Sequence, residues 1–93
     1  MKKEEKRYDR EAIYKKINEY EKKRVTRPNY KKALKHREDI KRIIEMHEYI
    51  IKNASSISQE YLMDIKLKID HLTYLCYAIE IFIIDCENAF KWR

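Results

Sequence analysis

The fold is decided by residues 59–91, QEYLMDIKLKIDHLTYLCYAIEIFIIDCENAFK. Apolar residues recur in this stretch at alternating steps of three and four, a heptad pattern typical of long helices packed at a shallow angle. The residues on this stripe are Leu62, Ile65, Ile69, Leu72, Cys76, Ile79, Ile83, Cys86 and Phe90. We therefore predict one long helix over residues 58–91. Ser58 is its candidate N-cap, and Ser56 with Gln59 forms a competing capping box.

A shorter amphipathic pattern lies near the N-terminus. Residues 8–24 place Ile13, Ile17 and Tyr20 on one face, which predicts a first helix. Residues 1–7 are almost all charged and have nothing to bury, so we expect them to be frayed.

A second helix is predicted over residues 30–53. Pro28 disfavours helical geometry at Arg27, and Thr26 or Asn29 can cap the helix that follows. The predicted inner face of this helix consists of Ala33, Leu34, Ile40, Ile43, Ile44, His47, Ile50 and Ile51.

The composition excludes most other fold classes. The 93 residues include no Gly and one Pro, whereas turn-rich β architectures need Gly, Asn or Asp for positive φ angles. Charged residues make up 41% of the chain, which suits amphipathic helices with solvated outer faces. We predict a single all-α domain over residues 1–93, a three-helix bundle dominated by a long antiparallel hairpin.

Signals for a membrane or secretory location are not evident. The longest apolar stretch, residues 72–84, has 13 residues and contains Glu80, whereas a membrane span needs roughly 20. The first residues lack the apolar centre of a signal peptide. Cys76 and Cys86 would lie about 15 Å apart along one helix, too far to pair with each other. We therefore expect a cytoplasmic protein with reduced cysteines and no membrane contact.

The third predicted helix carries more apolar surface than its own chain can cover. A short connection makes it antiparallel to the second helix, with residue 39 near residue 72 and residue 30 near residue 81. A two-fold homodimer would bury the surface that is left over. The alternatives are a first helix that wraps further around the bundle, or a monomer with half-exposed tyrosines. The residues predicted to mediate self-association are Tyr74, Tyr77, Ile81 and Ile84.

Positive charge concentrates in the first half of the chain. Residues 1–53 carry 18 Lys and Arg against 10 Asp and Glu, a net +8, while residues 54–93 carry 4 against 6, a net −2. Such a cluster predicts contact with nucleic acid, and a merely solvated face explains it equally well; an acidic protein surface is the third interpretation. The candidate contact residues surround the turn between the first two helices and are Lys22, Lys23, Arg24, Arg27, Tyr30, Lys31, Lys32, Lys35, Arg37, Lys41 and Arg42.

Patterns that would indicate chemistry are weak. Arg42 and His47 have the R-x4-H spacing of helical ribonucleases of the HEPN superfamily, which the chain resembles in this feature. Five residues turn a helix by about 140°, so the two side chains should diverge. Ile43 also stands where those enzymes usually place a polar residue. No metal-ligand spacing is present, and the lack of Gly excludes a phosphate-binding loop, so we predict no metal, cofactor or small-molecule substrate.

Together these patterns favour a small non-enzymatic binding or regulatory protein whose basic end contacts the nucleic-acid backbone. The alternative is a protein–protein regulator, an inhibitor or adaptor, that docks on an acidic surface of a larger complex. A HEPN-like helical ribonuclease is a third hypothesis, which depends on Arg42 and His47 alone. The turn around Pro28 does not resemble a helix-turn-helix, so reading of a base sequence in a groove is not predicted.

Overall fold

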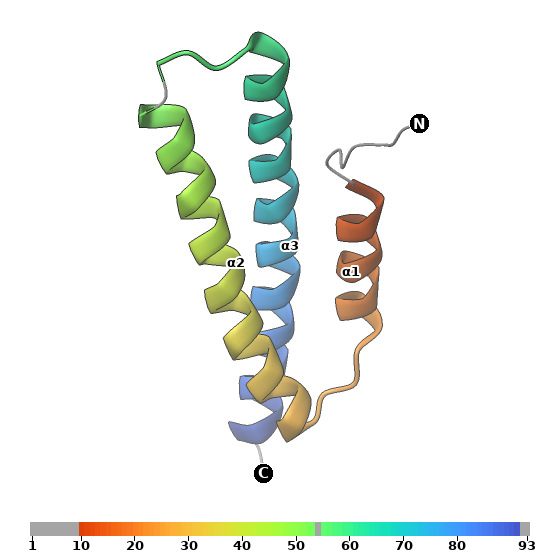
Figure 1. The fold of residues 1–93 in the computed structure, drawn as a ribbon. Coiled ribbons are helices and arrows are strands. Elements are labelled where there is room, and N and C mark those ends of the chain that lie inside the picture. Colours follow the sequence, from red (N-terminus) through yellow and green to blue (C-terminus); the bar gives the residue numbers. More distant parts are fainter. Residues whose placement is uncertain (1–9, 54, 92–93) are drawn as a thin grey trace.

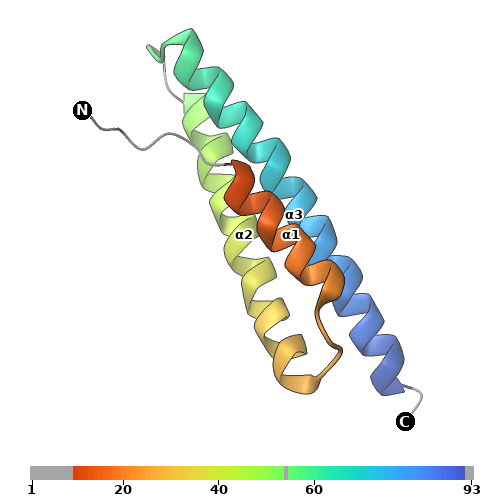
Figure 2. The ribbon, with the colours of Figure 1, turned by 90° about the vertical axis from the view of Figure 1, so that its right-hand side faces the viewer.

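The computed structural model of this chain describes residues 10–53 and 55–91. These residues form three helices, α1 (Arg10–Lys22), α2 (Arg27–Asn53) and α3 (Gln59–Lys91), and no strand. α2 runs antiparallel to α3, and α1 lies parallel to α3 on its other side (Figure 1). The side view of Figure 2 shows α1 lying along the middle of the hairpin. The predicted all-α architecture is therefore confirmed for the described residues, and the segment expected to fray lies outside them.

The starts of two helices are fixed by side-chain caps. The Oγ atom of Ser58 accepts a hydrogen bond from the backbone N–H of Tyr61 at 3.1 Å, as expected of the N-cap of α3. At α2, Oγ1 of Thr26 accepts from the N–H of Asn29 at 3.2 Å. α2 therefore begins at Arg27, three residues before the predicted start. Pro28 fits in the first turn of α2 because backbone N–H groups there have no acceptor within the helix, so the N–H that proline lacks is not needed for a helical hydrogen bond.

The core follows the predicted heptad stripe of α3. Ile79 is completely buried, and full burial of such a side chain stabilises a fold by about 1.5–3 kcal/mol. α1 contributes Tyr20, with Ile13 and Ile17 half-buried beside it, as its pattern predicts. The core residues of α2 and α3 are Ala33, Ile40, Leu72, Leu75, Ile79, Phe82, Ile83 and Cys86. Both α1 and α2 pack along α3 rather than on each other, so α3 is the central element of the bundle.

The register of the hairpin differs from the predicted one. Residue 30 was expected near residue 81, but the hydroxyl of Tyr30 donates to Oε2 of Glu87 at 2.9 Å and its ring meets that of Phe90. In the middle of the hairpin, Lys41 lies beside Glu80. α3 begins beyond the end of α2 (Figure 1), so the connection between them is not a tight turn. The aromatic contact at the opposite end holds the register instead.

One residue that was predicted on the inner face of α2 is exposed instead. Ile43 is 37% exposed, although its spacing suggested a place in the core. It lies two helical turns beyond His36, on the side of α2 that meets Tyr20 of α1. α1 packs on α3 and does not follow α2 upward, so this side of α2 loses its cover. None of the three described helices combines the length and the hydropathy that a membrane span requires.

Candidate functional site

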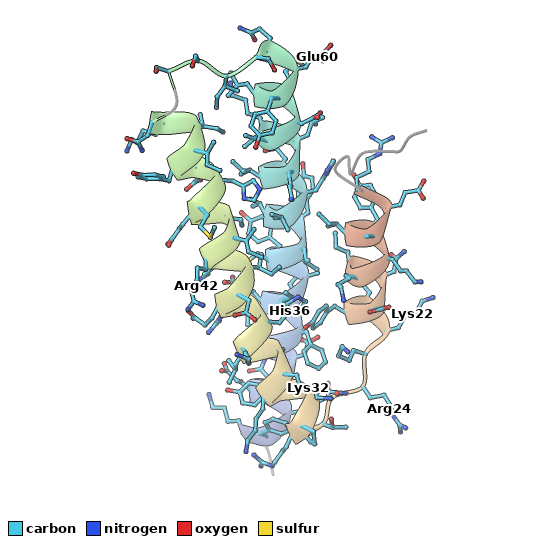
Figure 3. All side chains as sticks on the ribbon, in the orientation of Figure 1. Lys22, Arg24, Lys32, His36, Arg42 and Glu60 are labelled. Atoms are coloured by element: carbon cyan, nitrogen blue, oxygen red, sulfur yellow. The ribbon has the colours of Figure 1, made fainter. Side chains whose placement is uncertain are left out.

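The predicted basic residues extend from the end of α1 to the middle of α2. They come from the end of α1, from the segment that joins it to α2, and from the first half of α2. Figure 3 shows Lys22 and Arg24 on the α1 side, Lys32 near the start of α2, and Arg42 on the far side of α2. The structure thus places the cations over the half of the bundle that contains the start of α2, and it distributes them around that half rather than on one flat face.

Five of these ten cations have no ion-pair or aromatic partner among the described residues. All five are exposed. We call this group the cationic end, and it consists of Lys22, Arg24, Lys31, Lys32 and Lys35. Their charges are therefore available to a ligand.

Two other cations rest on aromatic rings of the bundle. Nζ of Lys23 lies 5.1 Å from the ring centroid of Tyr20, and the guanidinium carbon of Arg27 lies 4.3 Å from that of Phe90. A cation over an aromatic face is attracted by the ring quadrupole. These two residues therefore tie the ends of α1 and α2 to the core.

The remaining three basic residues belong to the surface of the hairpin. Nζ of Lys41 lies 3.6 Å from a carboxylate oxygen of Glu80, and the guanidinium of Arg42 lies 3.9 Å from Asp39. Arg37 is half-buried, and its Nε has no hydrogen-bond partner among the described residues. The sequence alone does not separate these engaged cations from the free ones.

The tyrosines near the basic residues are engaged as well. Besides its hydrogen bond to Glu87, Tyr30 packs edge-on against Phe90 with 5.5 Å between ring centroids. The bond to Glu87 is the largest cause that raises the pKa of Tyr30. Tyr20 is buried between His36 and Phe82. The buried Tyr20 is therefore not open to base stacking, while Tyr30 is half-buried, with its hydroxyl and one ring contact engaged within the bundle.

The cationic end also coincides with the N-terminus of α2. The first turn of this helix contains no acidic residue, while Lys31 and Lys32 follow directly after it. The helix dipole places partial positive charge at the same end, and acidic rather than basic side chains normally stabilise it. The two contributions add to a positive potential that an anion would neutralise.

A second candidate surface lies on α3, opposite the core. Tyr74, Tyr77, Ile81 and Ile84, the predicted self-association residues, are each between 54% and 61% exposed. The first helix does not wrap over them. The surface continues upward through Met63 and Leu67, which are also exposed and which the sequence reasoning missed. We call it the outer stripe, and it consists of Met63, Leu67, Asp70, Tyr74, Tyr77, Ile81 and Ile84.

A shallow hollow adjoins the outer stripe. It has a volume of about 240 Å³ and lies where the end of α1 meets α3. Its lining combines the apolar residues Val25, Ala78, Ile81 and Phe82 with Tyr20 and with the charged residues Glu21, Lys23 and Asp85. The outer stripe is therefore bordered on one side by space for an additional side chain.

The residues of the ribonuclease hypothesis do not meet. Nδ1 of His47 donates to the carbonyl oxygen of Ile43 at 2.8 Å, while Arg42 turns to Asp39 on the surface. Their diverging directions agree with the turn of about 140° expected between them. In residues 10–53 and 55–91, no three His, Cys, Asp or Glu side chains gather in a way that could hold a metal ion.

Comparison with protein-family models, with curated proteins and with solved structures gives no match for this chain. Its own residues and their arrangement are therefore the basis for a functional proposal.

Proposed function

We propose that this protein is a non-enzymatic binding or regulatory protein that contacts the backbone of nucleic acid through its cationic end. The observation that carries this proposal is the group of five exposed cations near the end of α1 and the start of α2, which make no ion pair and no aromatic contact within the part of the chain that the structure describes. Duplex DNA presents one negative charge per about 1.7 Å of its axis, surrounded by condensed counterions. Unpaired Lys and Arg side chains release these counterions on binding, which drives association.

The residue types favour nucleic acid over an acidic protein as the partner. Four of the five members of the cationic end are lysines. Lysine is depleted in protein–protein interfaces, whereas interfaces with nucleic acid are strongly positive. Because Tyr20 is buried and Tyr30 is half-buried against Phe90, we propose contact with phosphates in place of base recognition. Binding is then expected to depend weakly on base sequence.

We further propose that the protein is a homodimer of the cytoplasm. The outer stripe supports self-association, because its large apolar side chains stay exposed in a single copy. Cys76 is half-buried and Cys86 is buried, and both are free thiols, as fits a reducing compartment.

A charge reversal with a matched control tests the proposed interface. Lys31→Glu, Lys32→Glu and Lys35→Glu together lower the net charge by six, from +6 to 0. The control combines Lys15→Glu, Lys16→Glu and Lys52→Glu, which cause the same change in net charge at exposed positions outside the cationic end. Binding to labelled duplex DNA and RNA is measured by fluorescence anisotropy at low salt.

The first variant should lose most of its affinity, while the control should keep most of it. Because all three positions are exposed, the reversal is not expected to unfold α2, which circular dichroism would verify. Absence of binding by the native protein at low salt would remove the nucleic-acid proposal. Binding to polyglutamate in that case would favour the alternative, a regulator that docks on an acidic protein surface.

A further inference from the structure

The outer stripe has the spacing of a helix–helix seam. Its positions 63, 67, 70, 74, 77, 81 and 84 alternate steps of four and three, so they form a second heptad series on α3. Six of the seven residues are apolar and are between 45% and 61% exposed. The series spans about 32 Å and points away from Ile79 at the centre of the core.

The size of this surface matches a stable interface. Together the six apolar side chains expose on the order of 700 Å² per copy, close to the 800 Å² or so per partner in a standard protein interface. A seam with heptad spacing accepts another helix with the same spacing, and a second copy of α3 supplies one. From the arrangement of charges along this seam we infer that two copies of α3 pair antiparallel. The inference rests on the proposed self-association and adds its geometry.

Asp70 is the first argument for the antiparallel orientation. It is the one charged member of the seam, and it is exposed in the single copy. In a parallel pair with aligned ends, equivalent positions face each other, so two Asp70 carboxylates would meet within an apolar layer. Two like charges brought together away from water are strongly unfavourable. Antiparallel pairing moves them into different layers.

The charges along one edge of the seam are the second argument. Lys66, Glu80 and Glu87 occupy the same heptad position, with the cation toward the start of α3 and the acids toward its end. Within one copy Glu80 lies beside Lys41 and Glu87 accepts from Tyr30, each through Oε2, and each carboxylate has a second oxygen that can meet a cation of the other copy.

In an antiparallel pair this edge of one α3 lies against the same edge of the second α3, which runs in the opposite direction. Lys66 of one copy therefore meets an acidic residue of the other. In a parallel pair this edge faces the other edge, where Glu80 would approach Asp85 of the second copy. Complementary charges therefore favour the antiparallel pair.

One register pairs the seam from Met63 to Ile81, with the two-fold axis at the level of residue 72, and it places Ile84 opposite Glu60 of the second copy. Asp70 then lies opposite Tyr74 of the second copy, whose hydroxyl can donate to its carboxylate. Met63 lies opposite Ile81, beside the hollow of about 240 Å³, and its flexible side chain suits that space. On the opposite edge of the seam, Asp64 of one copy faces the uncharged Ala78 of the second copy. In this arrangement the two cationic ends lie at opposite ends of the dimer.

Cross-linking tests the orientation without nucleic acid. Native protein and ¹⁵N-labelled protein are mixed and treated with a zero-length carbodiimide reagent, and the linked peptides are identified by mass spectrometry. The expected product links Lys66 to Glu80 between a labelled and an unlabelled chain. Within one chain Lys66 and Glu80 lie about 21 Å apart along α3, so this link cannot form in a monomer.

A pair of matched substitutions tests the surface itself. Ile81→Asp places a charge on the outer stripe, whereas Met46→Asp places one on α2 at almost the same exposure, 59% against 61%. Sedimentation should show loss of the dimer for the first variant and an intact dimer for the second. A monomeric native protein would overturn both the proposed self-association and the orientation. A native dimer without the link between Lys66 and Glu80 would overturn the antiparallel arrangement alone, and neither result depends on nucleic-acid binding.

Discussion

The hydroxyl oxygen of Tyr20 in α1 lies 2.8 Å from Nδ1 of His36 in α2, with 5.7 Å between the two ring centroids. On its other side, the ring of Tyr20 makes an edge contact with Phe82 of α3 at 5.8 Å. Tyr20 therefore lies where the three helices meet. Because the backbones of α1 and α2 pack on α3 and not on each other, this pair connects the short helix to the first half of the hairpin.

Stability should fall as His36 becomes protonated. Burial is the main cause that lowers the pKa of His36, Lys16 and Lys23 lower it further, and Asp39 opposes them. The unfolded chain therefore binds a proton more readily than the folded protein in the range just below pH 6.5. The free energy of unfolding should decrease as the pH falls through about 6.5 and level off below the pKa of the folded state. Urea unfolding between pH 8 and pH 5.5 measures this dependence.

The comparison with His36→Gln isolates this effect. The variant retains its carboxylates, whose titration both proteins share, but it has no imidazole at the junction of the helices. Its free energy of unfolding should depend less on pH in this range. Equal pH dependence of the two proteins would contradict a role for His36 in the pH response of the fold.

The centre of the core should tolerate truncation poorly. Ile79 has no exposed surface, and Ile79→Ala removes buried methyl and methylene groups that α1 and α2 cannot replace. Such a change typically lowers the free energy of unfolding by about 2–5 kcal/mol. Met46→Ala, at a position that is 59% exposed, should change it by no more than about 0.5 kcal/mol. Urea unfolding at one fixed protein concentration compares them, and similar losses would contradict the described core.

The two thiols should react slowly in the folded protein. Burial is the main cause that raises the pKa of both Cys76 and Cys86, and neighbouring acids raise it further. The thiolate is the reactive form, so a raised pKa lowers the reaction rate at pH 8. Cys86, which has no exposed surface, should react last. A chromogenic disulfide reagent gives the rates, and Cys86→Ala assigns them. Rates equal to those in denaturant would contradict the burial of the thiols.

The sequence predicts α3 well because its pattern is local. The repeat from Leu62 to Phe90 marks the buried face without knowledge of any partner, and Ser58 is the cap expected from its type and position. Part of the outer stripe could also be predicted, because α3 has more apolar surface than the other two helices can bury, and Tyr74 and Ile81 belong to that surplus. Met63 and Leu67 were missed although the same heptad series reaches them.

Long-range contacts are what the sequence does not reveal. The partner of Arg27 is Phe90, 63 residues away, and no local pattern indicates that one rests on the other. The same contact region holds Tyr30 against Glu87 and so sets the register of the hairpin. A connection of five residues between α2 and α3 allows more than one register, which is why the prediction based on a tight turn was wrong. The same limitation conceals which cations are free.

Salt dependence distinguishes the free cations from the engaged ones. If Lys31 neutralises a phosphate, Lys31→Gln should reduce the slope of log affinity against log salt concentration by about 0.9 for duplex DNA. Lys41→Gln removes a cation of the same kind that already lies 3.6 Å from Glu80, so the slope should change little. Anisotropy titrations at several salt concentrations give both slopes. An equal reduction in the two variants would mean that intramolecular pairing does not decide which cations reach the nucleic acid.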